Sequence, residues 1–238
     1  MNILAMDSSS KAVSVAYLRD GKILGQFYLN AGLTHSTTLM PMTENLLKTA
    51  SLSLKDVDCF AVSIGPGSFT GLRIGISAIK GLSFAENKPC VGVSSLEAIA
   101  YNFYGSDTLV CSVIDARCQR FFCSFFRCHK DGSVDRLTND QTLSTDEIIT
   151  FIRQNYSAET ITLSGDGSEL AYSLLNHHLP NLEVAPEHLR YPQSNSVALI
   201  GEKLAKSGKT VTAQQLLPLY LALPQAQREL QKKMKNNP

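Results

Sequence analysis

The sequence has no apolar run that approaches the roughly 20 residues needed for a membrane-spanning helix. It also has no excess of charge of either sign, because 22 lysines and arginines stand against 21 aspartates and glutamates. A protein that grips nucleic acid alone usually carries a basic excess, since it must neutralise several phosphates. We therefore expect no membrane partner, and we expect any contact with RNA to depend on a partner protein.

The first residues, MNILAMDSSS, lack the basic and long apolar regions of a secretory signal peptide. This absence favours the cytoplasm, where the six cysteines would be reduced thiols and not a disulfide framework. The composition, 44% hydrophobic and 18% charged, is typical of a folded globular protein.

Both halves of the chain show the same order of predicted elements: three strands, a helix, a strand and a helix. Alternating apolar residues, turn signals and helix caps place these elements. In the first half they lie at 2–6, 13–17, 23–29, 34–50, 58–64 and 71–86, followed by a strand at 90–93 and a helix from 94 to about 104. In the second half they lie at 109–114, 120–127, 134–143, 144–155, 160–163 and 168–178, followed by a helix at 196–207. We predict two α/β lobes with mixed sheets, 1–104 and 105–238.

The densest motif follows the strand at 58–64 and reads GPGSFTGLRIG, from Gly65 to Gly75. We call its first six residues the signature loop: Gly65, Pro66, Gly67, Ser68, Phe69 and Thr70. Two interpretations stand. The free amides of the following helix could bind an anion, or the glycines could serve a tight turn and close helix packing. The loop lacks the Lys-Ser/Thr of a P-loop and the spacing of a dinucleotide loop.

Several segments together resemble the TsaB (YeaZ) family: Met1–Ser10, Thr34–Leu47, the GPGSFTGLRIG motif, Gly92–Leu96, Ile114–Arg117 and Leu217–Leu221. The resemblance implies the two-lobed α/β fold of the actin, sugar-kinase and Hsp70 (ASKHA) superfamily, which agrees with the duplicated order. It implies a partner protein in bacterial synthesis of threonylcarbamoyladenosine (t6A) in tRNA. The partners it implies are the catalytic paralogue TsaD, the small ATPase TsaE and tRNA through the complex, with self-association when the protein is alone.

The catalytic features of that superfamily are incomplete in this chain. TsaD carries a metal-binding His-x-x-x-His on its first helix, and the matching positions here are His35 and Leu39. One histidine cannot replace an i, i+4 pair of metal ligands. We therefore expect no metal site.

The positions that would bind phosphate also differ from those of a competent enzyme. Asp7, Ser8, Ser9 and Ser10 occupy the places of a carboxylate and a phosphate loop in the superfamily's ATPases. The corresponding turn of the second lobe, from Asp115 to Cys118, has a carboxylate and no glycine, which disfavours phosphate. The turn at 165–167 resembles a remnant of the nucleotide-base loop. We expect a vestigial cleft with no catalytic residue and no cofactor, and an active ATP-dependent kinase or a metalloprotease-like enzyme as the alternatives.

Apolar and small residues on the first two long helices predict a partner interface at Leu39, Met42, Leu46, Gly71, Arg73, Ile74, Gly75 and Ala78. The same stripes could instead face the protein's own sheet. Cys111, Cys118, Cys123 and Cys128 lack zinc-site spacing and are expected in the core. The basic tail with Arg228, Lys232, Lys233 and Lys235 is expected to be a solvated terminus.

Overall fold

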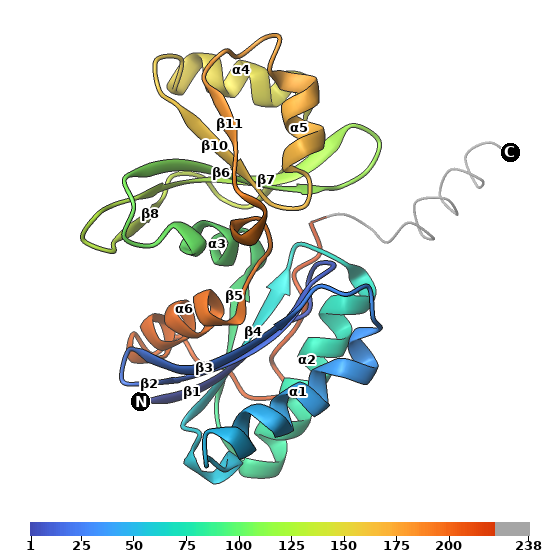
Figure 1. The fold of residues 1–238 in the computed structure, drawn as a ribbon, viewed down its shortest axis with the longest axis vertical. Coiled ribbons are helices and arrows are strands. Elements are labelled where there is room, and N and C mark those ends of the chain that lie inside the picture. The colour runs from blue at the N-terminus through green and yellow to red at the C-terminus, as the bar shows by residue number, and fades with distance from the viewer. Residues whose placement is uncertain (222–238) are drawn as a thin grey trace, which may run out of the picture.

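A computed structural model describes residues 1–221, which form two α/β lobes joined side by side (Figure 1). The predicted basic tail lies outside the described residues. None of the helices within 1–221 is long and apolar enough to cross a bilayer.

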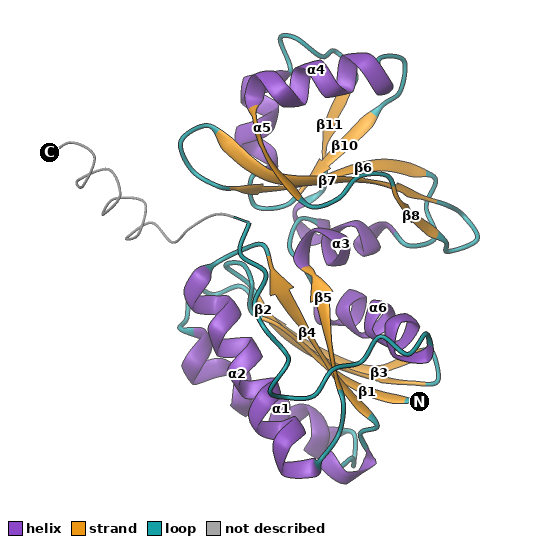
Figure 2. Ribbon diagram, turned by 180° about the vertical axis from the view of Figure 1, so that it is seen from behind, coloured by secondary structure: helices purple, strands orange, loops and turns teal. Residues whose placement is uncertain are grey.

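The first lobe is built on a five-stranded sheet with the order β3-β2-β1-β4-β5. Strands β1 (Asn2–Asp7), β2 (Val13–Arg19) and β3 (Lys22–Leu29) pair antiparallel, whereas β4 (Cys59–Gly65) and β5 (Cys90–Ser94) add in parallel. Helices α1 (His35–Thr49) and α2 (Phe69–Glu86) cover one face of this sheet, and α6 (Ser194–Lys206) covers the other (Figure 2).

The second lobe repeats the pattern with the strand order β11-β10-β6-β7-β8 and with β9 also paired to β7. Its strands are β6 (Thr108–Asp115), β7 (Arg120–Cys128), β8 (Val134–Arg136), β9 (Gln141–Ser144), β10 (Ile161–Ser164) and β11 (Leu182–Val184). Helices α4 (Thr145–Asn155) and α5 (Ser168–Leu175) pack on it. The predicted capping box at Ser144 and Glu147 starts α4 with both reciprocal hydrogen bonds.

A short helix, α3 (Ser95–Ala100), continues as a 3₁₀ turn (Tyr101–Phe103) and lies where the lobes meet. Further 3₁₀ turns span Leu54–Asp56 and Glu187–Leu189. The predicted strand at 134–143 is two short strands, separated by residues 137–140, where Asp140 lies within 2.6 Å of the Ser94 hydroxyl.

The proposed division between residues 104 and 105 separates the two sheets but needs correction at the C-terminal end. Helix α6 packs on β1, β2 and β4 of the first lobe. The segment after it also returns there, with Val211 pairing with Cys90 and Leu216 buried in the first-lobe core. The first lobe therefore consists of two chain segments, because its sheet has two apolar faces and α6 is needed to cover the second.

Candidate functional site

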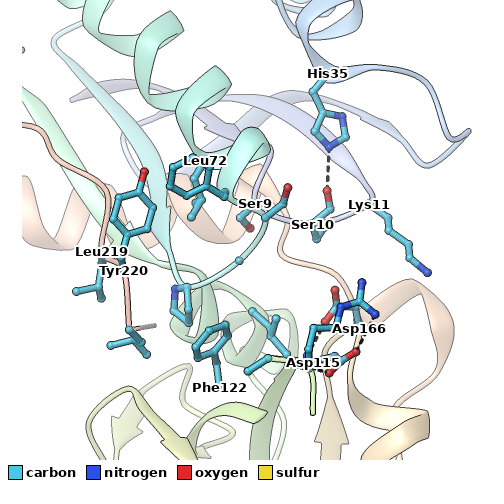
Figure 3. A pocket seen from close by; sticks show the side chains of 18 of the residues that line it. Ser9, Ser10, Lys11, His35, Leu72, Asp115, Phe122, Asp166, Leu219 and Tyr220 are labelled. Atoms are coloured by element: carbon cyan, nitrogen blue, oxygen red, sulfur yellow. Dashed lines mark hydrogen bonds and ion pairs between the residues drawn. The ribbon is translucent and has the colours of Figure 1, made fainter. Parts of the chain in front are cut away.

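A cleft of about 650 Å³ lies between the lobes (Figure 3). One wall comes from the serine loop, residues 8–10 after β1, and from the signature loop. The opposite wall comes from residues 114–117, Phe122 and Asp166 of the second lobe. A C-terminal segment, residues 216–221, brings Leu219 and Tyr220 to the same cavity. The cleft brings together the serine loop and the Asp115 turn, the two places where the sequence analysis expects a vestigial phosphate site.

Asp7 ends β1 and is completely buried. The backbone N–H and the hydroxyl of Ser9 both donate to its carboxylate, at 3.1 and 3.0 Å. Burial raises the pKa of Asp7 to about 6, because desolvation of the charged form outweighs these hydrogen bonds.

The serine loop and the signature loop are interlocked. The N–H of Ser68 donates to the Ser9 carbonyl at 2.8 Å, and the Ser8 hydroxyl donates to the Gly71 carbonyl at 2.8 Å. A Cβ on Gly67 or Gly71 would lie closer than 3.0 Å to the carbonyl oxygen of Ser9 or Ser8, respectively. Of the two interpretations of the motif, close packing is therefore the one the contacts support. The glycines let α2 approach the serine loop, and the protein's own backbone fills the space.

The second-lobe wall presents the turn that begins at Asp115 to the cleft. The Asp115 carboxylate accepts from the backbone N–H of Arg117 at 2.7 Å and pairs with its guanidinium at 3.3 Å. Arg117, Cys118 and Gln119 all adopt positive φ without being glycine. Asp115 and Arg117 both line the cleft, and they are paired with each other.

The turn at 165–167 uses its glycines for packing. Gly165 has φ +129°, and a Cβ there would collide with the carbonyl oxygen of Val113. A Cβ on Gly167 would meet the Asp115 backbone nitrogen at 2.8 Å. Close packing against Val113 and Asp115 therefore explains why both positions are glycine, and binding of a nucleotide base is not needed to explain them.

His35 begins α1, and its Nε2 lies 2.8 Å from the carbonyl oxygen of Ser10. Leu39, one turn later, is buried in the first-lobe core. Within residues 1–221, no group of three histidine, cysteine or acidic side chains could hold a metal ion. The contact that the structure gives the His35 ring is the one with the Ser10 carbonyl, which connects α1 to the serine loop.

The predicted partner residues divide into two sets, which corrects part of that prediction. Leu39 and Leu46 are 1% and 2% exposed and lie in the lobe's own core. Gly71 and Gly75 face the serine loop, where the Ser8 hydroxyl would meet a Cβ on Gly75. Within this chain the sheet and the serine loop already cover these four positions.

The other set is accessible: Met42, Ile74 and Ala78 are partly exposed, and Arg73 is exposed. Next to them lies a shallow groove of about 490 Å³, with Met40 and Leu47 of α1 and Leu82 of α2 in its lining. Met40 is 42% exposed. The surface available to a partner is therefore this groove and the α2 stripe beside it.

The cysteine prediction holds for three of four positions. Cys111, Cys123 and Cys128 are buried, and burial raises the pKa of each thiol, to about 12 for Cys123 and about 11 for Cys128. Cys118 is exposed, because it lies on the positive-φ turn and not in a strand.

The role of residues 216–221, which we call the strap, was not predicted. The Leu219 N–H donates to the Ile64 carbonyl at 2.7 Å. The Tyr220 ring stacks on Phe69 with centroids 5.1 Å apart, and its hydroxyl accepts from Arg73 Nε at 3.1 Å. The Arg73 guanidinium lies 4.0 Å from the centre of the Phe69 ring. The only sequence signal was that the strap and the signature loop both belong to the family resemblance.

We expect Tyr220→Ala to release the strap. The variant loses an aromatic stack and a hydrogen bond to an arginine, together worth about 1–2 kcal/mol. Hydrogen exchange of the 216–221 peptide should therefore be about tenfold faster, while Tyr220→Phe, which keeps the stack, should be intermediate. Equal exchange in all three proteins would show that the clamp does not hold the strap.

Two lobes with a duplicated strand and helix order, facing each other across a cleft, define an ASKHA-type α/β protein. The fold likeness extends to component A of the (R)-2-hydroxyglutaryl-CoA dehydratase of Acidaminococcus fermentans, with a TM-score of 0.51 at 11% identity over 87% of this chain and 99% of that one. The family model for tRNA N6-adenosine threonylcarbamoyltransferase matches residues 29–230.

Closer relatives cover nearly the whole chain. The tRNA threonylcarbamoyladenosine biosynthesis protein TsaB of Escherichia coli is 30% identical over 93% of this chain and 94% of its own length. TsaB of Bacillus subtilis is 26% identical over 95% and 96%. The solved structure of YeaZ from Pseudomonas aeruginosa matches at a TM-score of 0.77 and 28% identity, over 92% of this chain and 99% of that one. The chain belongs to the TsaB (YeaZ) family, as its motifs predicted.

Proposed function

We propose that this chain is a non-catalytic subunit of the cytoplasmic bacterial machinery that makes t6A in tRNA. Its partner is the catalytic paralogue TsaD, and it activates that enzyme by binding it. The small ATPase TsaE and the tRNA join through the complex. Full-length similarity to proteins named for t6A biosynthesis supports the pathway.

The observation that carries the non-catalytic role is the interlocked serine loop. The Ser8 hydroxyl and the Ser9 carbonyl are already bonded to the start of α2. A phosphate at this position would have to displace backbone that the glycines bring into contact. On the opposite wall the Arg117 guanidinium is paired with the Asp115 carboxylate at 3.3 Å.

The groove between α1 and α2 supports the partner role. Exposed apolar surface beside a polar rim marks association sites, and here it includes Met40 and Leu82 of the groove and the partly exposed Ala78 beside it. A two-fold pairing of such helix pairs gives a four-helix contact. Since TsaD is a paralogue, the same face serves for self-association when TsaD is absent.

The function is tested by reconstitution with purified TsaD, TsaE, ATP, bicarbonate, threonine, the enzyme that makes the threonylcarbamoyl donor, and unmodified tRNA. We expect t6A to form only when this chain is present, and we expect no ATP hydrolysis by this chain alone. Undiminished modification without it would defeat the proposal. ATP turnover by the purified chain would defeat its non-catalytic part.

The interface is tested with Ala78→Glu. Because residue 78 is partly exposed, the lobe should still fold, whereas a charge buried in the contact should weaken binding to TsaD by about 2 kcal/mol, roughly 30-fold in Kd. Ser173→Glu is the control for an added surface charge, since this exposed serine lies on α5 of the second lobe, away from α1 and α2. Calorimetric titration with TsaD measures both affinities, and equal values would show that the α2 surface at Ala78 is not part of the interface.

A further inference from the structure

Helix α3 and the 3₁₀ turn after it are buried on both sides, with each side in a different lobe. Leu96, Ile99 and Phe103 belong to a core cluster with β6 and β7 of the second lobe. Ala98 and Tyr101 belong to another cluster, with α6 and the strands of the first lobe. None of these five side chains is more than 8% exposed. The segment therefore contributes side chains to the apolar cores of both lobes.

The N-terminal end of α3 is tied to the second lobe by charged and polar groups. The Arg136 guanidinium bridges Glu97, at 2.7 Å, and Asp140. Asp140 in turn accepts from the Ser94 hydroxyl at 2.6 Å. Asp140 and Glu97 have side chains only 9% and 25% exposed, so Arg136 neutralises two carboxylates that are largely withdrawn from water.

The C-terminal end of the same segment is tied to the chain that crosses back to the first lobe. The Asn102 amide nitrogen donates to the carbonyls of Leu189 and Tyr191, both at 2.8 Å. Its amide oxygen accepts from the Ser196 hydroxyl, at the start of α6, at 2.9 Å. Both connections between the lobes, before β6 and before α6, are thus bonded to each other at Asn102.

We propose that α3 fixes the angle between the lobes, so that the cleft has one width and does not close. Domain closure needs a few residues that can absorb a change in φ and ψ. Here the hinge segment is a buried helix, packed on both sides and bonded at both ends. The chain is then a platform of constant shape, which goes beyond the proposed role as a subunit and does not depend on it.

The test measures the distance between one label on each lobe of the full chain. Lys48→Cys in α1 and Gln154→Cys in α4 are exposed helix positions for spin labels, and Cys118→Ser removes the exposed native thiol. Electron spin resonance should give one narrow distance distribution, unchanged by millimolar ATP and Mg²⁺. A broad distribution, or a shift with ATP, would overturn the proposal.

Two variants test the residues named. Arg136→Leu leaves Glu97 and Asp140 without their shared arginine. Asn102→Ala removes the hydrogen bonds to Leu189, Tyr191 and Ser196. Each should broaden the distance distribution and speed hydrogen exchange of the 95–103 amides by at least about tenfold. Arg127→Leu is the matched control, because it breaks an ion pair with Glu159 inside the second lobe and should change neither measurement.

Circular dichroism establishes which variants are folded before the distances between the spin labels are compared. If Asn102→Ala fails to fold, Arg136→Leu and the unmutated chain still decide the question. If folded Arg136→Leu protein has the distances and exchange rates of the control, Arg136 and its ion pairs do not fix the angle between the lobes. Reconstituted t6A synthesis is a separate measurement, so a movable cleft in an active subunit and a fixed cleft in an inactive one are distinguishable.

Discussion

Asp7→Asn is expected to make the protein more stable at pH 8. Burial raises the pKa of this carboxyl from 3.8 to about 6. Between these two values the folded state binds more protons than the unfolded state, so stability falls as the pH rises through this range. Above about pH 7 the folded protein carries the full cost of a buried charge, about 3 kcal/mol for a shift of about two units. Asparagine removes that charge and keeps an oxygen that can accept from the Ser9 N–H.

The measurement is the difference in stability between Asp7→Asn and the unmutated chain across the pH range. It should approach about 3 kcal/mol at pH 8, a rise in Tm of roughly 6–12 °C for a chain of this size, and should vanish near pH 4. Asp56→Asn is the control, because the pKa of Asp56 is lowered by hydrogen bonds from Ser53, so this variant should not gain stability at high pH.

Asp7→Asn also tests whether the Asp7 carboxylate has a catalytic role. If Asp7 has no catalytic role, Asp7→Asn should support t6A synthesis at the unmutated rate in the reconstituted system. A loss of stability at pH 8 together with a loss of modification would instead indicate an ionised Asp7 that holds a cation in the working complex.

Local sequence signals predicted most of the fold. Alternation and turn residues placed the hairpin strands of both lobes, and the serine caps at 94 and 144 placed the starts of α3 and α4. The return of α6 to the first lobe could not be predicted this way. Its own apolar stripe shows that one face is buried, but only the assembled sheet shows which lobe has an uncovered face.

The site was harder to predict, because its contacts join residues far apart in the chain. The histidine comparison placed His35 at the helix start, yet its bond to Ser10 depends on the folded loop. Helical spacing identified Leu39 and Leu46 as apolar positions and could not tell a core stripe from a partner stripe. The bond between Leu219 and Ile64 spans more than 150 residues, and no pattern within either segment indicates it.

Gly71→Ala and Gly81→Ala, in the same helix, are expected to have opposite effects. At Gly81 a Cβ meets nothing within 4 Å, so alanine should stabilise α2 by about 0.5–1 kcal/mol through its better helix propensity. At Gly71 the same Cβ would collide with the Ser8 carbonyl, which is backbone and cannot rotate away. Forced repacking of this kind costs about 3 kcal/mol.

Thermal unfolding of the two variants tests whether the glycines of the GPGSFTGLRIG motif serve packing. Gly71→Ala should lower Tm by roughly 6–12 °C, while Gly81→Ala should raise it by about 1–4 °C. Because the collision pushes α2 away from the serine loop, Gly71→Ala should also weaken the Ser68 to Ser9 and Ser8 to Gly71 bonds and speed amide exchange at 68–71. If Gly71→Ala instead keeps the stability of the unmutated chain but loses t6A synthesis, the glycine serves a ligand or partner at the loop, and close packing is not the reason for it.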